Sequence, residues 1–361
     1  MTYTVKKILL ALTIATLSMV SCHNDSWNFF GRDNNVKVVL NVKSPQMQTL
    51  RGEASGLNSA LGAIDNFNNN SELWDTYDLR YILEIYEVTT NNSTTATSTN
   101  PIYKRQVKTT DNYNAEGINF EMLLVPNRTY KFVVWADFVN EGESDDLYYD
   151  TTNLRAITRK GDYAHTAMEE ALDAYHISVS KEVKQAMDLP LTLTRPMAKL
   201  RVVAIDHNEI SNYSTPTNVS VKFDTENNPV YKTFDAIDNR ILDNCAAHTY
   251  NYSIDPAPYM EYEGKSSEGA DISGLVLFSD YIFAQREINE GEKNEQAVSF
   301  SMTITFDNNE STTRTINFDT QIPINRNYLT TVIGNCLTQQ DSFVFNIDDT
   351  LLSKEETVIN Y

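Results

Sequence analysis

Hydrophobic and polar residues alternate with a period of two along much of this chain. The first run places Val36, Val38, Leu40 and Val42 on one side, with Lys37 among the residues on the other. Successive side chains of a β-strand point to opposite faces, so this pattern indicates a strand with one buried face.

Three later runs repeat this alternation, at 79–85, 130–138 and 298–306. Antiparallel strands with one wet face show such a pattern, and we expect each run to expose its polar residues to water. Those residues are Arg80 and Glu84 in the first run, Lys131 and Asp137 in the second, and Ser299, Ser301, Thr303 and Thr305 in the third.

Helical periodicity is scarce. It predicts a short helix within 164–172 and a second, weaker one at 181–187. Polar, turn-rich segments separate the predicted strands, and the Thr/Asn/Ser tract at 89–100 is expected to cap a hairpin. The predicted fold class is therefore all-β, with minor short helices. The other turn-rich segments are 66–71, 112–117 and 208–218.

A domain boundary is predicted where Pro190 and Pro196 flank an extended segment and a new strand begins at 198. The size of the chain is consistent with two domains. We expect two β-sandwiches in tandem, spanning 36–196 and 197–361. A linker at 22–35 would precede them.

The first 21 residues resemble a lipoprotein signal. Lys6 and Lys7 precede an apolar stretch at 8–20, and small residues lead to Cys22. Cleavage before Cys22 would leave that cysteine as an acylated N-terminus, whose acyl chains would anchor the protein to a membrane. The alternative is an ordinary signal peptide with an incidental cysteine. The stretch is too short to span a bilayer, which takes about 20 apolar residues.

Charge and cysteine content limit the partners of this protein. The net charge is −20, and loss of Lys6 and Lys7 makes it −22. Such a surface repels phosphate backbones, which excludes nucleic acid as a natural partner. Once Cys22 is acylated, Cys245 and Cys336 remain, either as two buried thiols or as a disulfide.

No motif for catalysis, a metal or a cofactor stands out. The segment 264–266 resembles the end of a phosphate loop, but Tyr259 stands where that motif needs glycine. The predicted class is therefore a non-enzyme without a cofactor or metal. Trp74 and Trp135 are expected to pack in a core or interface rather than bind sugar. The histidines, which lack zinc-ligand spacing, are His23, His165, His176, His207 and His248.

An acidic segment offers oxygen ligands that calcium could use, but it lacks the order of an EF-hand loop. Acidic loops are usually solvated surface, and we expect this one to be so. Its residues are Asp137, Glu141, Glu143, Asp145, Asp146 and Asp150.

Four segments, together with the cysteine at 22, resemble the Bacteroidales fimbrillin superfamily, the lipoprotein precursors of cell-surface fimbriae. They are the strand at 35–40, Leu-Leu-Val-Pro-Asn-Arg-Thr-Tyr-Lys-Phe-Val-Val-Trp-Ala-Asp at 123–137, the segment 193–202, and 322–338, which is the most specific. The resemblance covers the whole chain and implies two transthyretin-like β-sandwiches in series. It also implies a precursor that is anchored in the outer membrane by its lipid and exposed at the cell surface. The Trp-Ala-Asp form places the chain near an uncharacterised branch.

The resemblance also implies processing. In polymerising members of the superfamily, an Arg-specific protease cuts after the first strand. Arg51-Gly52 is the best-placed match here, and Arg32 is poorer because it precedes the strand. The cut would release the lipid together with strand 36–42. Burial of its four inward side chains contributes roughly 6–12 kcal/mol, against a domain stability of about 5–15 kcal/mol.

An emptied groove of this kind can be filled by an extended segment of a neighbouring subunit. The candidate donor carries Phe343, Phe345 and Ile347 on one side, and 351–359 could extend it. Alternatively, the same run is the last strand of its own sandwich. We therefore expect a structural or adhesive fimbrial subunit that exchanges strands with itself or other subunits. A membrane-retained anchor or accessory lipoprotein, or a monomeric module binding glycan or host protein, are the alternatives.

Overall fold

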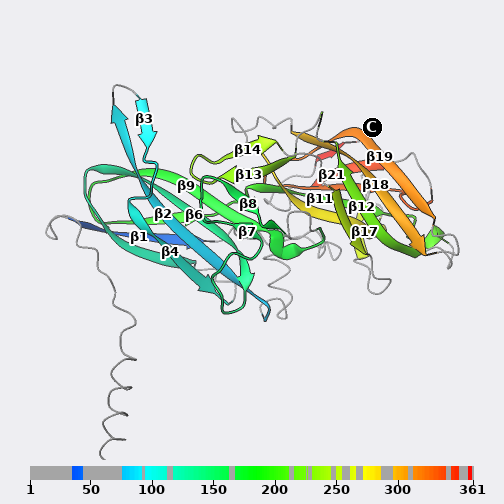
Figure 1. Cartoon of the computed structure of the whole chain (residues 1–361), viewed down its shortest axis with the longest axis horizontal. Coiled ribbons are helices and arrows are strands. Elements are labelled where there is room, and N and C mark those ends of the chain that lie inside the picture. The colour runs from blue at the N-terminus through cyan, green and yellow to red at the C-terminus, as the bar shows by residue number, and fades with distance from the viewer. Residues whose placement is uncertain are drawn as a thin grey trace, which may run out of the picture.

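The computed structural model describes residues 35–43, 75–91, 94–111, 117–161, 167–210, 215–224, 226, 230–244, 249–253, 261–265, 271–285, 296–307, 312–338, 343–348 and 357–359. Most of this part of the chain is β-strand, and its helical residues form only short 3-10 turns (Figure 1). The prediction of an all-β fold is confirmed.

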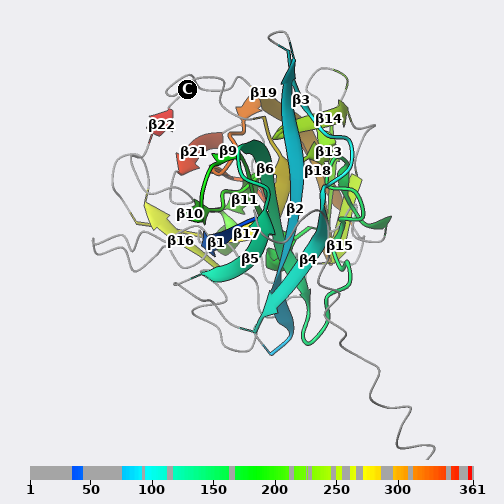
Figure 2. The same cartoon turned by 90° about the vertical axis from the view of Figure 1, so that its left-hand side faces the viewer.

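Two sheets face one another in the N-terminal half. In sheet A, β1 (Val36–Lys43) lies between β5 (Ile118–Leu124) and β10 (Met187–Thr192). Figure 2 shows these three strands grouped together. Sheet B runs in the order β3 (Thr94–Thr97), β2 (Tyr77–Asn91), β6 (Arg128–Asn140) and β9 (Ala174–Val183), and β4 (Tyr103–Thr110) also pairs with β2.

Two further sheets form the C-terminal half. Sheet C runs in the order β22 (Thr357–Ile359), β21 (Phe343–Asp348), β20 (Leu329–Gly334), β11 (Met197–Ala204), β17 (Asp271–Phe283), β13 (Tyr231–Asp235), β8 (Ile157–Arg159) and β7 (Tyr149–Asp150). Its branches are β14 (Arg240–Asn244) on β13 and β16 (Glu261–Lys265) on β17. Sheet D orders β15 (Thr249–Ser253), β12 (Thr215–Phe223), β18 (Ala297–Asp307) and β19 (Thr313–Pro323).

The two halves have separate main cores but share a junction. The core of the C-terminal half consists of buried residues from 198 onward. The core of the N-terminal half also includes Phe234 and Phe283 from later in the chain. In addition, β8 pairs with β13 across the predicted boundary. The division at 196/197 stays a prediction, and the structure adds that the halves are joined by sheet as well as by side chains.

Several patterns in the sequence were interpreted correctly. In β18, Val298, Phe300, Met302 and Ile304 are buried as the alternation predicts. Ser299 on the other face was expected in water, but it is buried as well. The polar tract at 89–100 belongs to a hairpin, because β2 pairs antiparallel with β3 from Val88 opposite Thr97 to Asn91 opposite Thr94. This hairpin projects beyond the body of the molecule (Figure 1).

The helix predicted at 181–187 is wrong. Residues 181–183 end β9, and Met187 begins β10. From the first predicted helix, only Glu170–Leu172 is helical, as a short 3-10 turn, and 164–166 lie outside the described residues. A second 3-10 turn, which the sequence did not suggest, covers His207–Glu209. Pairing of β9 with β6 over ten residues outweighs a weak helical preference.

The exposed faces predicted for β2 and β6 are also wrong in part. Arg80, Glu84 and Asp137 are buried, because both faces of these two central strands are covered. Alternation of charged and apolar residues identified the strands correctly, but it could not show that Arg80 and Asp137 neutralise one another.

Candidate functional site

In the part of the chain that the structure describes, the strand β1 lies between β5 and β10 and joins them into sheet A. It runs antiparallel to β5, with Val36 opposite Leu124 and Val42 opposite Ile118. It runs parallel to β10, from Val38 opposite Met187 onward. Within the described residues, β5 and β10 belong to a sheet only through β1. Removal of β1 would therefore leave two unpaired strand edges facing one gap.

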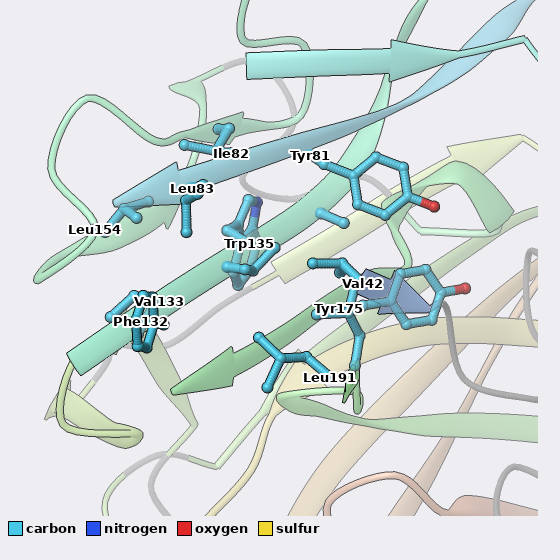
Figure 3. Packing of buried hydrophobic residues seen from close by; sticks show 14 of the residues in the cluster. Val42, Tyr81, Ile82, Leu83, Phe132, Val133, Trp135, Leu154, Tyr175 and Leu191 are labelled. Carbon is cyan, nitrogen blue, oxygen red and sulfur yellow. The ribbon is translucent and has the colours of Figure 1, made fainter. Parts of the chain in front are cut away.

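The inward face of β1 is fully buried. Val38, Leu40 and Val42 are all 0% exposed, and Val36 is partly buried against the same core. Figure 3 shows Val42 beside Tyr175 of β9 and Leu191 of β10. These side chains close the core between sheets A and B, as the alternation in the sequence predicts for one face of this strand.

The outward face of β1 makes two polar contacts with β5. Lys37 Nζ lies 2.8 Å from Glu121 Oε2, and Asn41 Nδ2 donates to Asn119 Oδ1 at 2.9 Å. Both contacts are exposed, and exposed pairs of this kind typically contribute less than about 1 kcal/mol. Their contribution is therefore to register rather than to stability. Asn41 lies directly opposite Asn119 in the ladder, and Lys37 reaches diagonally to Glu121, which is opposite Val39.

A glycine lies at one end of the β1 slot, by which we mean the position between β5 and β10 that β1 fills. Gly117, just before β5, has a φ of +77°, and a Cβ built there would lie 2.3 Å from the carbonyl oxygen of Val42. Glycine adopts positive φ readily and has no Cβ. The position therefore requires glycine for two reasons, of which the close approach of the strand in the slot is one.

Gly117→Ala is expected to destabilise the intact protein more than Gly142→Ala. Gly142 has a similar φ of +71° but has no atom within 4 Å of its built Cβ. The control should show only the cost of the backbone conformation, about 1 kcal/mol, whereas Gly117→Ala adds the clash with β1. Urea denaturation of both variants measures the difference. Equal losses would show that β1 does not press against Gly117.

Part of the acidic segment forms a buried ion-pair cluster rather than a solvated surface. Arg80 donates from Nε and Nη2 to the two oxygens of Asp137, at 2.9 and 2.7 Å. Its Nη1 lies 2.8 Å from Asp146, which also accepts from the hydroxyl and backbone N–H of Thr151. Burial alone would raise the pKa of Asp146, but the bonds from Thr151 and the Arg80 charge hold it below its usual value. These contacts fix the segment after β6 over the outer face of sheet B.

A second buried cluster joins the two halves. Lys199 of β11 binds Glu170 at 2.6 Å, and Tyr281 of β17 donates to the same carboxylate. Next to it, Arg195 pairs with Asp173 at 2.8 Å. Burial lowers the pKa of Lys199, although Glu170 opposes this shift. Charged residues inside the otherwise apolar strand β11 were the one signal in the sequence for this cluster.

The predicted donor segment lies in its own sheet in this structure. Phe343, Phe345 and Ile347 are on β21, which pairs antiparallel with β20 over six residues. This arrangement places the segment in its own sandwich. Three of its residues pair in turn with β22.

Several predicted site residues lie outside the described residues. They are the lipidation site Cys22, the cleavage pair Arg51 and Gly52, the alternative Arg32, and Trp74 and Cys245. Trp135 is fully buried in the first core, as expected. Cys336 is a buried free thiol, and burial raises its pKa well above the usual value.

The described part of the chain offers neither a metal site nor a membrane-spanning helix. It contains no cluster of three or more His, Cys, Asp or Glu side chains that could hold a metal ion. Its helices are also all too short or too polar to cross a membrane. The feature that distinguishes the fold is the central position of β1 in a three-stranded sheet.

Together, the four sheets define an all-β protein in which β1 is the middle strand of sheet A. The chain belongs to a family of unknown function (DUF6562), whose pattern matches residues 31–359. A search of curated proteins found no match.

Several solved structures are similar to this chain at low identity. One is a Bacteroides thetaiotaomicron protein proposed to bind polysaccharides (DUF1812), with 12% identity, a TM-score of 0.42, and coverage of 90% of this chain and 98% of that one. A Bacteroides uniformis protein proposed to act in cell adhesion has 10% identity, a TM-score of 0.41, and coverage of 89% and 99%. The tip fimbrial protein Mfa3 of Porphyromonas gingivalis, with a C-terminal truncation, has 11% identity, a TM-score of 0.36, and coverage of 87% and 99%.

Proposed function

We propose that this protein is a structural or adhesive subunit of a bacterial cell-surface fimbria, exported as a lipoprotein precursor and assembled by strand exchange. The observation that carries the proposal is the place of β1. It fills the middle of sheet A, it supplies three fully buried side chains to the core, and it alone joins β5 to β10 in that sheet. The lipoprotein signal and the fimbrillin resemblance in the sequence support the same function.

Loss of β1 supplies the driving force for assembly. The buried side chains of Val38, Leu40 and Val42 contribute roughly 4.5–9 kcal/mol at 1.5–3 kcal/mol each. The loss also leaves the facing backbone groups of β5 and β10 without partners. An extended segment of another subunit restores both the apolar contacts and the ladder.

The proposed cleavage site fits this order of events. Arg51-Gly52 follows β1 in the sequence, so a cut there separates the acylated Cys22 and β1 from the rest of the chain. The lipid then holds the precursor at the outer membrane until cleavage. Once cleaved, the subunit has an open groove, and the segment with Phe343, Phe345 and Ile347 from a second copy is the proposed donor.

Arg51→Ala is expected to abolish assembly. Treatment of the purified wild-type precursor with an Arg-specific protease should give a species that starts at Gly52 and forms ladders that resist SDS. Arg51→Ala should remain monomeric under the same treatment, with N-terminal sequencing as the check. Arg32→Ala is the matched control, because it removes an arginine before β1 and should polymerise like wild type. Polymerisation of Arg51→Ala at the wild-type rate would contradict cleavage at this site.

A second candidate is an anchor or accessory lipoprotein that retains β1. The observation in its favour is that the intact chain is closed, with β1 in its slot and β21 paired in its own sheet. Protein isolated from cells that still contains residues 23–50 and partitions into detergent would favour this function. Shed protein that starts at Gly52 would favour the first.

A further inference from the structure

The strand that would leave the groove and the segment proposed to replace it share a sequence pattern. Residues 38–42 read Val-Val-Leu-Asn-Val, and residues 343–347 read Phe-Val-Phe-Asn-Ile. Both have apolar residues at the first, third and fifth positions, valine at the second and asparagine at the fourth. In β1 the odd positions are the buried ones, and the asparagine faces outward.

Building on the proposed function, we propose that β21 of a second copy occupies the vacated β1 slot in one register, with Asn346 in the place of Asn41. Phe343, Phe345 and Ile347 then take the places of Val38, Leu40 and Val42. Asn119 of β5 favours this register, because it accepts a hydrogen bond from Asn41 in the intact chain and could accept the same bond from Asn346. A shift by two residues would place an apolar side chain or a charge opposite Asn119 instead.

The length of the segment fits the slot. The residues of β1 that pair with β10 run from 38 to 43, which is six positions, and β21 has six residues. Asp348 would take the place of Lys43, beside Gly117. Since Gly117 has no side chain, the end of the slot is open to the backbone of any strand that enters in this register.

Phenylalanine at 343 and 345 is larger than the valine and leucine that it replaces. Overpacking a fixed core is unfavourable. The walls of this slot, however, are joined within the described part of sheet A only by β1. Once β1 leaves, no ladder holds β5 and β10 at a set spacing, so the slot can widen around the larger side chains.

A second segment carries a similar pattern but fits less well. Residues 357–361 read Thr-Val-Ile-Asn-Tyr. In the same register, Thr357 would bury a hydroxyl where Val38 is 0% exposed, and Glu356 would replace Lys37, the ion-pair partner of Glu121. Two carboxylates at that contact would repel one another, and a buried hydroxyl needs a partner. For β21, the neutral Ser342 stands in that position. The observations therefore favour β21 as the occupant.

Site-directed disulfide formation tests the register. One full-length precursor carries Asn119→Cys, and a second, with a tag of different mass, carries Asn346→Cys. After mixing, treatment with the Arg-specific protease and mild oxidation, we expect a disulfide-linked heterodimer on non-reducing SDS gels. Val344→Cys is the matched control, because it also faces outward but lies two residues away. We expect at least tenfold less heterodimer from it than from Asn346→Cys.

Two further controls make each outcome decisive. The intact Asn41→Cys/Asn119→Cys double variant should form an intrachain disulfide, which shows that this pair of positions is competent to bond. Asn360→Cys as the donor tests the competing segment. A stronger yield from Val344→Cys would overturn the register, and a stronger yield from Asn360→Cys would overturn the occupant. SDS-resistant ladders without the Asn119–Asn346 link would refute this inference alone, whereas no ladders from wild type would refute the proposed function.

Discussion

Leu40→Ala is expected to lower the free energy of unfolding of the intact precursor by about 2–5 kcal/mol. Leu40 is 0% exposed at the centre of β1, and replacing a buried leucine by alanine removes apolar contacts and leaves a cavity. The neighbouring Val38 and Val42 are equally buried, so the site has no route to water that would reduce the cost. Urea denaturation of the intact precursor, followed by tryptophan fluorescence, measures the change.

Lys37→Ala is the control for this prediction. The Lys37 side chain is 56% exposed and pairs with Glu121 at the surface, so its loss should change stability by less than about 1 kcal/mol. A similar cost for the two variants would show that β1 is not part of the core. Since the proposed strand exchange depends on an emptied apolar slot, that result would also remove the basis for it.

Arg80→Ala is expected to destabilise the protein by about 3–5 kcal/mol. The substitution leaves Asp137, which is 0% exposed, without its bidentate partner, and an unpaired buried charge is costly. It also releases Asp146 and with it the segment fixed over sheet B. Thermal and urea unfolding of the variant measure the loss.

Two comparisons isolate the buried ion pair. Arg128→Ala removes an exposed arginine that pairs with Glu87 at 2.8 Å, and should cost no more than about 1 kcal/mol. The double variant Arg80→Met/Asp137→Leu should recover much of the stability lost in Arg80→Ala, because both charges are then replaced by apolar groups. A double variant no more stable than Arg80→Ala would indicate that packing of the arginine, rather than the charge of Asp137, dominates.

Of the candidate site, the sequence predicted β1 itself but not the two strands that border it. Alternation in 36–42 identifies the strand and its inward face, because a strand with one buried face repeats every two residues. The walls of the slot were not predictable in this way. β5 and β10 are separated from β1 by many tens of residues, and no local pattern specifies which strands will pair. From the sequence alone, Gly117 is an ordinary loop residue and Asn119 an ordinary strand residue. Their importance is visible only once β1 is seen to lie against them.

The errors in the sequence analysis have the same origin. The segment 181–187 has weak helical periodicity, but its first residues are held by β6 and Met187 pairs with β1. Arg80 and Asp137 were expected in water, because charged residues that alternate with apolar ones usually mark an exposed face. They are buried because they lie opposite one another on β2 and β6, in a cross-strand pair formed by residues 57 apart in the chain.

The sequence by itself determined that this protein is built of strands and which residues of β1 face inward. These properties follow from local periodicity and from short contiguous segments, which act without the rest of the chain. Only the tertiary structure decided that β1 is the middle strand of sheet A, that Gly117 and Asn119 border its slot, and that buried ion pairs fix the outer face of sheet B and the junction of the halves. Each of these depends on pairing and burial between residues far apart in sequence, which are settled only when the whole chain has packed.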